Sequence, residues 1–268
     1  MDHAKQLLSP YIALGPLELH LWLTFYDELA GDQLRAAYRA LLNDAENEQE
    51  SHFYFEKDRW RYVVTRALVR TVLSCYAPVA PKDWIFLTNK YGRPEIANTQ
   101  EMEIGLVFNI SHTESLIVLG VTKHRALGVD VENIYRREIS VEIAERFFAR
   151  DEVAELACVP PHRQQDRFFE YWTFKESYIK ARGMGLSLPL DKFSFYFTHD
   201  RVVKIAIHPE LADDGARWHF WQFRPRREYL VAVCAERVDT RALRLVIRKL
   251  VPARSEEFLV TEILRTSE

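Results

Sequence analysis

Residues 168–191, FFEYWTFKESYIKARGMGLSLPLD, form the stretch that decides the fold. At 3.6 residues per turn, Phe169, Trp172 and Glu176 fall on one face of a helix, so a carboxylate lies within an apolar stripe. An ionised carboxylate in such a place needs a positive partner. Lys180, one turn further on, is one candidate and a metal ion is another. A simple ion pair between Glu176 and Lys180 at a solvated edge is the alternative.

The composition is that of a soluble globular protein. The 268 residues suffice for one large domain or two lobes, and 48% of them are hydrophobic and 28% charged. A net charge of −3 provides no basic field for nucleic acid or an anionic membrane. The three cysteines lie too far apart for the usual zinc patterns. With no signal sequence and no apolar run of about 18 residues, we expect a cytoplasmic protein that does not enter a membrane.

A second stretch places two carboxylates on one face of a strand. In Ala126–Glu132, alternation puts Asp130 and Glu132 on the same face as Gly128. Carboxylates side by side repel each other, and a divalent cation relieves that repulsion. The pattern therefore indicates candidate metal ligands, and Gly128 is expected to leave room for a ligand.

The remaining elements suggest helices followed by a small antiparallel sheet in each half. We predict helices over Asp32–Leu42, Phe53–Tyr76, Ser140–Ala149 and Asp151–Ala157, and a loop over Val159–Gln165 before the helix of residues 168–182. We predict strands over Leu17–Phe25, Trp84–Thr88, Phe193–Phe197, Arg201–Ile207, Arg217–Phe223 and Tyr229–Ala235, and an antiparallel set over Val107–His112, Leu116–Thr122 and Ala126–Glu132. For residues 238–268 the pattern does not distinguish helix from strand.

Four motifs, in their order and spacing, resemble the 4′-phosphopantetheinyl transferases of the surfactin-synthetase-activating (Sfp) type. They are Tyr91–Pro94 (YGRP), Phe108–His112 (FNISH), Gly128–Glu132 (GVDVE) and Trp172–Lys180 (WTFKESYIK) with the GLSLPL that follows. The similarity extends from about Phe53 to Phe197.

The resemblance implies an α+β fold with two similar lobes in a pseudo-twofold arrangement, each with helices packed on a small antiparallel sheet. We expect the lobes at residues 1–125 and 126–268, an active site in the cleft between them, and a monomer. The implied reaction transfers the 4′-phosphopantetheine arm of coenzyme A to a serine of an apo acyl or peptidyl carrier protein. Such carrier proteins serve fatty-acid, polyketide or non-ribosomal peptide synthesis. The reaction depends on Mg²⁺ and releases adenosine 3′,5′-bisphosphate.

The resemblance also implies roles for individual residues. Asp130, Glu132 and Glu176 would hold Mg²⁺ against the pyrophosphate. Arg61, Arg93, Ser111, His112, Lys175 and Lys180 would bind coenzyme A, and Lys180 would contact its phosphates. Glu176 and Lys180 are the candidate catalytic residues. Glu176 is a metal ligand, a base or both, and His112 is an alternative base.

One segment departs from the family pattern. Members of the family commonly carry lysines just before the pair Phe53-Tyr54, and these contact the 3′-phosphate of coenzyme A. This chain has the acidic segment Glu46–Glu50 there, so Arg61, Arg93 and His112 would have to carry more of that contact.

Two other functions are compatible with parts of the pattern. A metal-dependent nuclease would use the same carboxylates with Lys180, but the acidic net charge and the SH and GRP elements argue against it. A non-catalytic module that binds coenzyme A or a carrier protein would leave the three carboxylates and Lys180 without a purpose.

Overall fold

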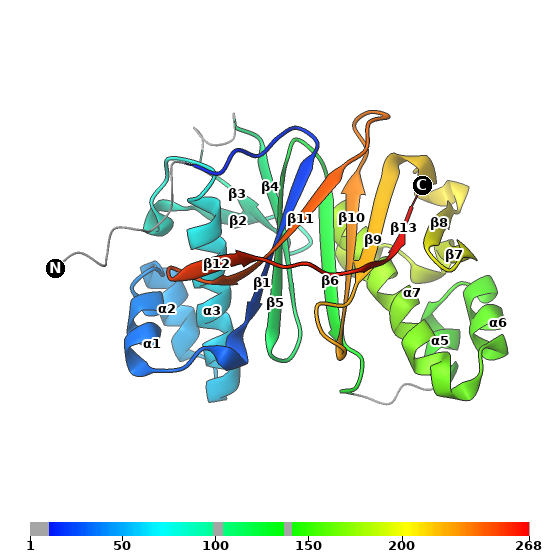
Figure 1. Cartoon of the computed structure of the whole chain (residues 1–268), viewed down its shortest axis with the longest axis horizontal. Coiled ribbons are helices and arrows are strands. Elements are labelled where there is room, and N and C mark those ends of the chain that lie inside the picture. Colours follow the sequence, from blue (N-terminus) through cyan, green and yellow to red (C-terminus); the bar gives the residue numbers. More distant parts are fainter. Residues whose placement is uncertain (1–10, 99–103, 137–140, 268) are drawn as a thin grey trace.

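The computed structural model describes residues 11–98, 104–136 and 141–267 of the chain. It is an α+β protein with two larger β-sheets near the middle of the molecule and helices towards both ends of its long axis (Figure 1). A two-stranded sheet of β2 (Phe86–Thr88) and β3 (Pro94–Ile96) lies beside the first of them. No helix within the described residues combines the length and the apolar character needed to cross a membrane.

The first sheet has five strands in the order β12-β11-β1-β5-β4. They are β1 (Glu18–Phe25), β4 (Leu106–His112), β5 (Leu116–Lys123), β11 (Arg244–Val251) and β12 (Ser255–Phe258). The central strand β1 is antiparallel to β5 and parallel to β11. Helices α1 (Asp32–Arg39), α2 (Asp44–Ser51) and α3 (Glu56–Leu73) lie on the outer side of this sheet, and α1 and α3 share its hydrophobic core.

The second sheet has six strands in the order β6-β10-β9-β13-β8-β7. They are β6 (Leu127–Asn133), β7 (Phe193–His199), β8 (Val202–Ile207), β9 (Trp218–Phe223), β10 (Tyr229–Glu236) and β13 (Ile263–Thr266). Helices α5 (Val141–Phe147), α6 (Arg150–Cys158) and α7 (Pro161–Arg182) pack on it. Single 3₁₀ turns occur at Tyr26–Glu28, Pro81–Asp83, Gly185–Ser187, Leu190–Lys192, Pro209–Leu211 and Gly215–Arg217.

The inner faces of the two sheets pack against each other through apolar side chains. Alternation along β1 directs Leu19, Leu21 and Leu23 to this shared core and Trp22 to the core beneath α3. Strand β10 is covered on both faces in the same way, with Val231 and its alternate neighbours facing the first sheet. Burial on both faces explains why both strands are largely apolar.

Most predicted elements are confirmed, and two predictions need correction. Only β4 and β5 of the expected antiparallel set pair with each other; β6 pairs with β10 in the second sheet. The expected loop at Val159–Gln165 is helical from Pro161, because proline is well suited to the first turn of a helix. Of the helix predicted over Ser140–Ala149, Ser140 lies outside the described residues.

The C-terminal residues return to both sheets. The segment that the sequence left open between helix and strand forms β11 and β12 in the first sheet and β13 in the second. Residues 244–258 therefore complete the sheet that contains β1, although they belong to the second of the two predicted lobes. At the end of α7, Gly183 has a φ of 65°, as expected for a glycine that terminates a helix.

Candidate active site

Helix α7 and strand β6 approach each other with almost no space between their backbones. A Cβ atom on Gly128 would lie 1.9 Å from the carbonyl oxygen of Ser177 and 2.4 Å from the amide nitrogen of Ala181. The space beside Gly128 is thus filled by the helix, and it is not left for a ligand as the sequence suggested. The close approach brings Glu176 and Lys180 of α7 towards the carboxylates of β6.

Strand β4, at the edge of the first sheet, is linked to β6 by side chains. From Asn109 to Thr113, just past the end of β4, every second residue is polar, and its side chain accepts a hydrogen bond from a backbone amide of β6. The pairs are Asn109 Oδ1 with Val129 N (2.8 Å), Ser111 Oγ with Val131 N (3.3 Å), and Thr113 Oγ1 with Asn133 N (3.3 Å). These three side chains take the place of a backbone ladder and fix Ser111 beside Asp130.

Lys180 is the centre of a short polar cluster. Its Nζ donates hydrogen bonds to Asp130 Oδ1 at 2.6 Å and to Ser111 Oγ at 2.9 Å. The Ser111 hydroxyl in turn donates to Asp130 Oδ1 at 3.1 Å. The other carboxylate oxygen, Asp130 Oδ2, is buried and has no hydrogen-bond partner among the described residues. A buried anionic oxygen without a partner is costly unless a cation or donor reaches it.

Two further carboxyl groups lie within electrostatic reach of Asp130. Burial, followed by the negative charge of Asp130, raises the pKa of Glu132 to about 7. The same two causes raise the pKa of Glu176 to about 7. Glu132 Oε1 accepts a hydrogen bond from Trp172 Nε1 at 3.2 Å, whereas Glu176 has neither a hydrogen bond nor an ion pair with any described residue. Three acidic side chains therefore lie close together, and the positive charge of Lys180 does not fully compensate them.

This donor set fits a hard divalent cation. No group of three His, Cys, Asp or Glu side chains within the described ranges is already placed to hold a metal ion, and Lys180 occupies one oxygen of Asp130. The free oxygen Asp130 Oδ2 and the two carboxyl groups nearby nevertheless supply the oxygen donors that Mg²⁺ prefers. A phosphate ligand would complete such a shell, because Mg²⁺ commonly shares protein carboxylates with substrate phosphates.

The cluster opens into a pocket of about 520 Å³ between α3, β4 and β6. Ser111, His112, Asp130, Glu132 and Lys180 form one part of its lining. Helix α3 contributes a cationic part with Arg61 and Arg66, beside Tyr62. Desolvation and the nearby Arg61 lower the pKa of His112 and favour its neutral form. The pocket thus has positive groups at two separate walls, as a ligand with several phosphates requires.

Arg93 is directed to helix α7 and not into this pocket. Its Nη1 donates to the carbonyl oxygens of Lys180 at 2.7 Å and Ala181 at 3.4 Å, and its Nη2 donates to Phe108 O at 3.4 Å. These bonds satisfy carbonyl groups in the last turn of α7, where a helix attracts a positive charge. The structure therefore assigns Arg93 a contact that the sequence did not predict, one that holds the backbone of Lys180.

We expect Arg93→Ala to lower turnover by roughly tenfold, because small displacements of a catalytic group are costly. The affinities for coenzyme A and for dephospho-coenzyme A, which lacks the 3′-phosphate, should change by the same factor. Titration calorimetry with both ligands checks this. A loss confined to coenzyme A would instead support the contact with the nucleotide phosphate that the motif implies.

The expectation that Lys175 binds coenzyme A needs correction. Its side chain is fully buried on the other side of α7, where Nζ lies 2.7 Å from each of Glu152 Oε2, Leu190 O and Phe193 O. Burial lowers the pKa of Lys175 and raises that of Glu152. All three hydrogen atoms of the ammonium group have protein acceptors, so none is available to a ligand.

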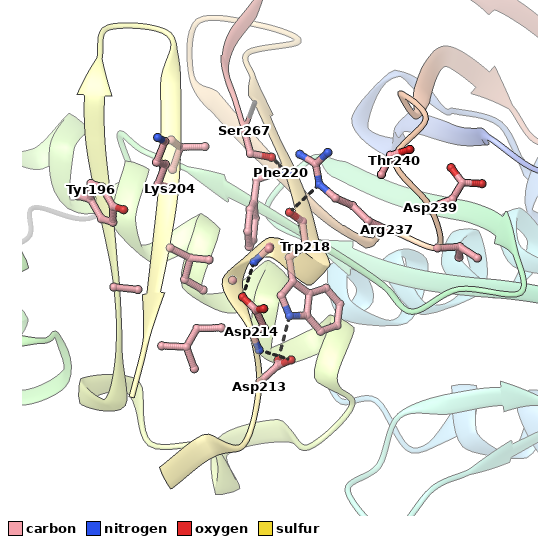
Figure 2. Close-up of a pocket in the computed structure, with 17 residues that line it drawn as sticks. Tyr196, Lys204, Asp213, Asp214, Trp218, Phe220, Arg237, Asp239, Thr240 and Ser267 are labelled. Carbon is pink, nitrogen blue, oxygen red and sulfur yellow. Dashed lines mark hydrogen bonds between the residues drawn. The ribbon is translucent and has the colours of Figure 1, made fainter. Parts of the chain in front are cut away.

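A larger pocket of about 970 Å³ lies between β8 and β9 (Figure 2), away from all predicted site residues. Its most buried carboxylate, Asp213, already accepts from Tyr178 Oη at 2.7 Å, Arg182 Nη1 at 2.6 Å and Trp218 Nε1 at 2.9 Å. This carboxylate is therefore a structural anchor, and the smaller pocket is the candidate active site.

Sequence reasoning missed several residues that shape the site. Trp172 was placed in a motif without a role, and its indole holds Glu132. Asn109 and Thr113 flank Ser111 at two-residue spacing, and that alternation of polar residues within an apolar strand was the available signal. Arg66 lines the pocket from α3. In the sequence, nothing distinguished it from the other arginines of the predicted helix.

Comparison with known proteins agrees with the motifs. Residues 30–124 match the family model "4′-phosphopantetheinyl transferase, N-terminal", and residues 126–234 match "4′-phosphopantetheinyl transferase superfamily". The 4′-phosphopantetheinyl transferase Sfp of Bacillus subtilis is 31% identical over 215 residues, which cover 80% of this chain and 91% of Sfp. The 4′-phosphopantetheinyl transferase HetI of Nostoc sp. is 32% identical over 209 residues, covering 78% of this chain and 86% of HetI. The family inferred from the four motifs is confirmed, and the chain belongs to the 4′-phosphopantetheinyl transferase superfamily.

Proposed function

We propose that this enzyme transfers the 4′-phosphopantetheine arm of coenzyme A to a serine of an apo carrier protein in the pocket between α3, β4 and β6. The observation that carries the assignment of the site is the convergence of Lys180, Ser111 and Asp130 within 3.1 Å, beside two further carboxyl groups. Acyl and peptidyl carrier proteins are the proposed partners, in the cytoplasm, with the enzyme acting as a monomer.

The residues have distinct roles in this proposal. The serine oxygen of the carrier protein forms a bond to the phosphorus next to pantetheine, and the bond from that phosphorus to the bridging oxygen breaks. Adenosine 3′,5′-bisphosphate leaves. Lys180 offsets the charge that develops on the phosphate oxygens. Glu176, whose carboxylate has no donor among the described residues, accepts the proton of the serine hydroxyl directly or through a water molecule.

Asp130, Glu132 and Glu176 are the proposed ligands of Mg²⁺. When bound, the ion supplies charge neutralisation for the pyrophosphate and orients it. Ser111 and His112 bind phosphate oxygens of coenzyme A from β4, and Arg61 adds a positive charge from α3. Asp130 Oδ2, which has no hydrogen-bond partner within residues 11–98, 104–136 and 141–267, supports the metal assignment.

We further propose that the chain forms two similar lobes, residues 1–125 and 126–268, in a pseudo-twofold arrangement. Two separate hydrophobic cores, each between a helical layer and a sheet, support this division. The strands of residues 244–258 then cross over and complete the first lobe. The site lies where β4 of one sheet meets β6 of the other.

Glu176→Gln is predicted to leave the metal-free protein as stable as the wild type or more stable. The change removes a half-buried charge that has no hydrogen-bonded partner among the described residues, at nearly constant shape. The same variant should lose most catalysis and most of the rise in melting temperature that Mg²⁺ with coenzyme A produces. Melting curves with and without both ligands provide the measurement. If the variant keeps the full rise, Glu176 belongs to the protein's own packing and not to the ligand site.

One incubation tests the proposed function. Coenzyme A, Mg²⁺ and an apo carrier protein are mixed with the enzyme, and the intact mass of the carrier protein is followed. The mass should increase by one phosphopantetheine arm, and a carrier protein with its acceptor serine replaced by alanine should not change. If coenzyme A binds but the carrier protein stays unmodified at every Mg²⁺ concentration, the protein is a binding module and not a transferase.

A further inference from the structure

The acidic segment before α3 does not face the pocket. Glu46 of α2 accepts a hydrogen bond from Arg70 Nε at 2.8 Å, and Glu50 accepts one from Arg39 Nε at 2.8 Å. Both glutamates are buried and neither lines the pocket. Two of the acidic side chains of this segment, Glu46 and Glu50, are therefore paired with arginines inside the N-terminal half.

Two arginines on α3 line the wall of the pocket that Lys180 does not occupy. Arg61 has a close acidic partner, since its Nη2 lies 2.9 Å from Asp58 Oδ1. Among the described residues, the acidic partner of Arg66 is more distant: Arg66 Nε lies 3.7 Å from Glu46 Oε1, and Glu46 already accepts a hydrogen bond from Arg70. The Nε atom of Arg66 is buried and forms no hydrogen bond within the described residues. Arg66 thus has a weaker contact with an acidic side chain than Arg61 has.

The neighbours of Arg66 hold it in a defined place. Its guanidinium carbon lies 5.3 Å from the centre of the Tyr62 ring, within the range of a cation–π contact. The side chain of Arg66 is 31% exposed and lines the pocket. A planar guanidinium held against a ring at the wall of a pocket is suited to bind a phosphate through two oxygens.

We propose that Arg66 binds the phosphate monoester on the ribose of coenzyme A, the 3′-phosphate, and so distinguishes coenzyme A from its dephospho form. The inference rests on the proposed function, because that function places the pyrophosphate beside Lys180 and Asp130 and leaves the cations of α3 to another part of the ligand. The wall formed by α3 then receives the nucleotide end. Arg66 takes over the contact for which the segment Glu46–Glu50 offers no cation.

The test compares Arg66→Gln with a matched control, Lys57→Gln. Lys57 is an exposed cation on the same helix that does not line the pocket, so both variants lose one positive charge from α3. Binding of coenzyme A and of dephospho-coenzyme A is measured by titration calorimetry in the presence of Mg²⁺. Arg66→Gln should weaken coenzyme A binding by at least about tenfold, the effect of losing a hydrogen bond to a charged group. Its affinity for dephospho-coenzyme A, and both affinities of Lys57→Gln, should stay within about twofold of wild type.

A third variant separates the phosphate contact from simple charge. Arg66→Lys keeps the positive charge but cannot form the two-point contact, so its affinity for coenzyme A should lie between those of wild type and Arg66→Gln. Unchanged melting temperatures without ligand confirm that the fold is retained.

The outcomes also separate this inference from the proposed function. If Arg66→Gln lowers the affinities for coenzyme A and dephospho-coenzyme A equally, or lowers neither, while the wild type still modifies a carrier protein, only the role of Arg66 is overturned. If the wild type itself fails to bind coenzyme A, the proposed function falls and this inference falls with it.

Discussion

Asp130→Ala and Glu132→Ala are each expected to lower the rate of carrier-protein modification by at least about a hundredfold, because the charge of the pyrophosphate would go unneutralised. Asp130 has a buried oxygen with no hydrogen-bond partner in the part of the chain that the structure describes, and the charge of Asp130 helps to raise the pKa of both nearby glutamates. This arrangement indicates that a cation binds here in addition to the ammonium group of Lys180. Rates from intact mass, measured across a Mg²⁺ titration, provide the check.

The control for this experiment is Asp166→Asn, which removes an acidic charge from a partly exposed position on α7 outside the pocket, where Asp166 Oδ2 lies 3.3 Å from Arg224 Nη2. Its rate should equal that of the wild type. All variants should keep their fold, since the Ser111 link to β6 does not depend on either carboxylate. Near-normal rates in Asp130→Ala or Glu132→Ala at ordinary Mg²⁺ concentrations would remove these residues from the metal assignment.

Lys175→Met should lower the free energy of unfolding by about 3–5 kcal/mol, the cost of leaving one member of a buried ion pair without its partner. Glu152 would keep only the amide donors of Phe195 (2.8 Å) and Ala149 (3.0 Å). Two carbonyl groups, of Leu190 and Phe193, would lose their donor as well. Denaturant unfolding followed by circular dichroism measures the loss.

The double variant Lys175→Met/Glu152→Gln should recover a large part of that stability, because no buried charge then remains unpaired. Where Lys175→Met is still folded, its affinity for coenzyme A should match that of the wild type. If the variant is stable but binds coenzyme A poorly, Lys175 contributes to coenzyme A binding as the motif implied.

The motif at Trp172–Lys180 contains two lysines, and the sequence assigned both to coenzyme A although only Lys180 lines the pocket. Lys175 and Lys180 are five residues apart, which places them about 140° from each other around a helix. Glu176 and Lys180, four residues apart, share a face. Helical geometry alone therefore contained the signal that Lys175 points away from Lys180, and similarity to a family obscured it.

Local patterns predicted elements better than they predicted partners. The alternation in β6 showed which face carries Asp130 and Glu132, but nothing in that strand specifies that it pairs with β10 and not with β5. The contact of Arg93 with the carbonyl of Lys180 joins residues 87 positions apart, and it became visible only with the fold. Such long-range contacts leave little trace in the spacing of a single sequence.

The parallel pairing of β1 with β11 also constrains the order in which the chain can fold. Thr24 of β1 donates a hydrogen bond to Leu250 O just beyond the paired residues, across 226 positions of sequence. A nascent chain that has released only its first half presents β1 with an unpaired edge, and such edges invite association with other chains. Closing so long a loop slows folding. The sheet that begins with the first strand of the chain is therefore complete only after residues 244–258 have been synthesised.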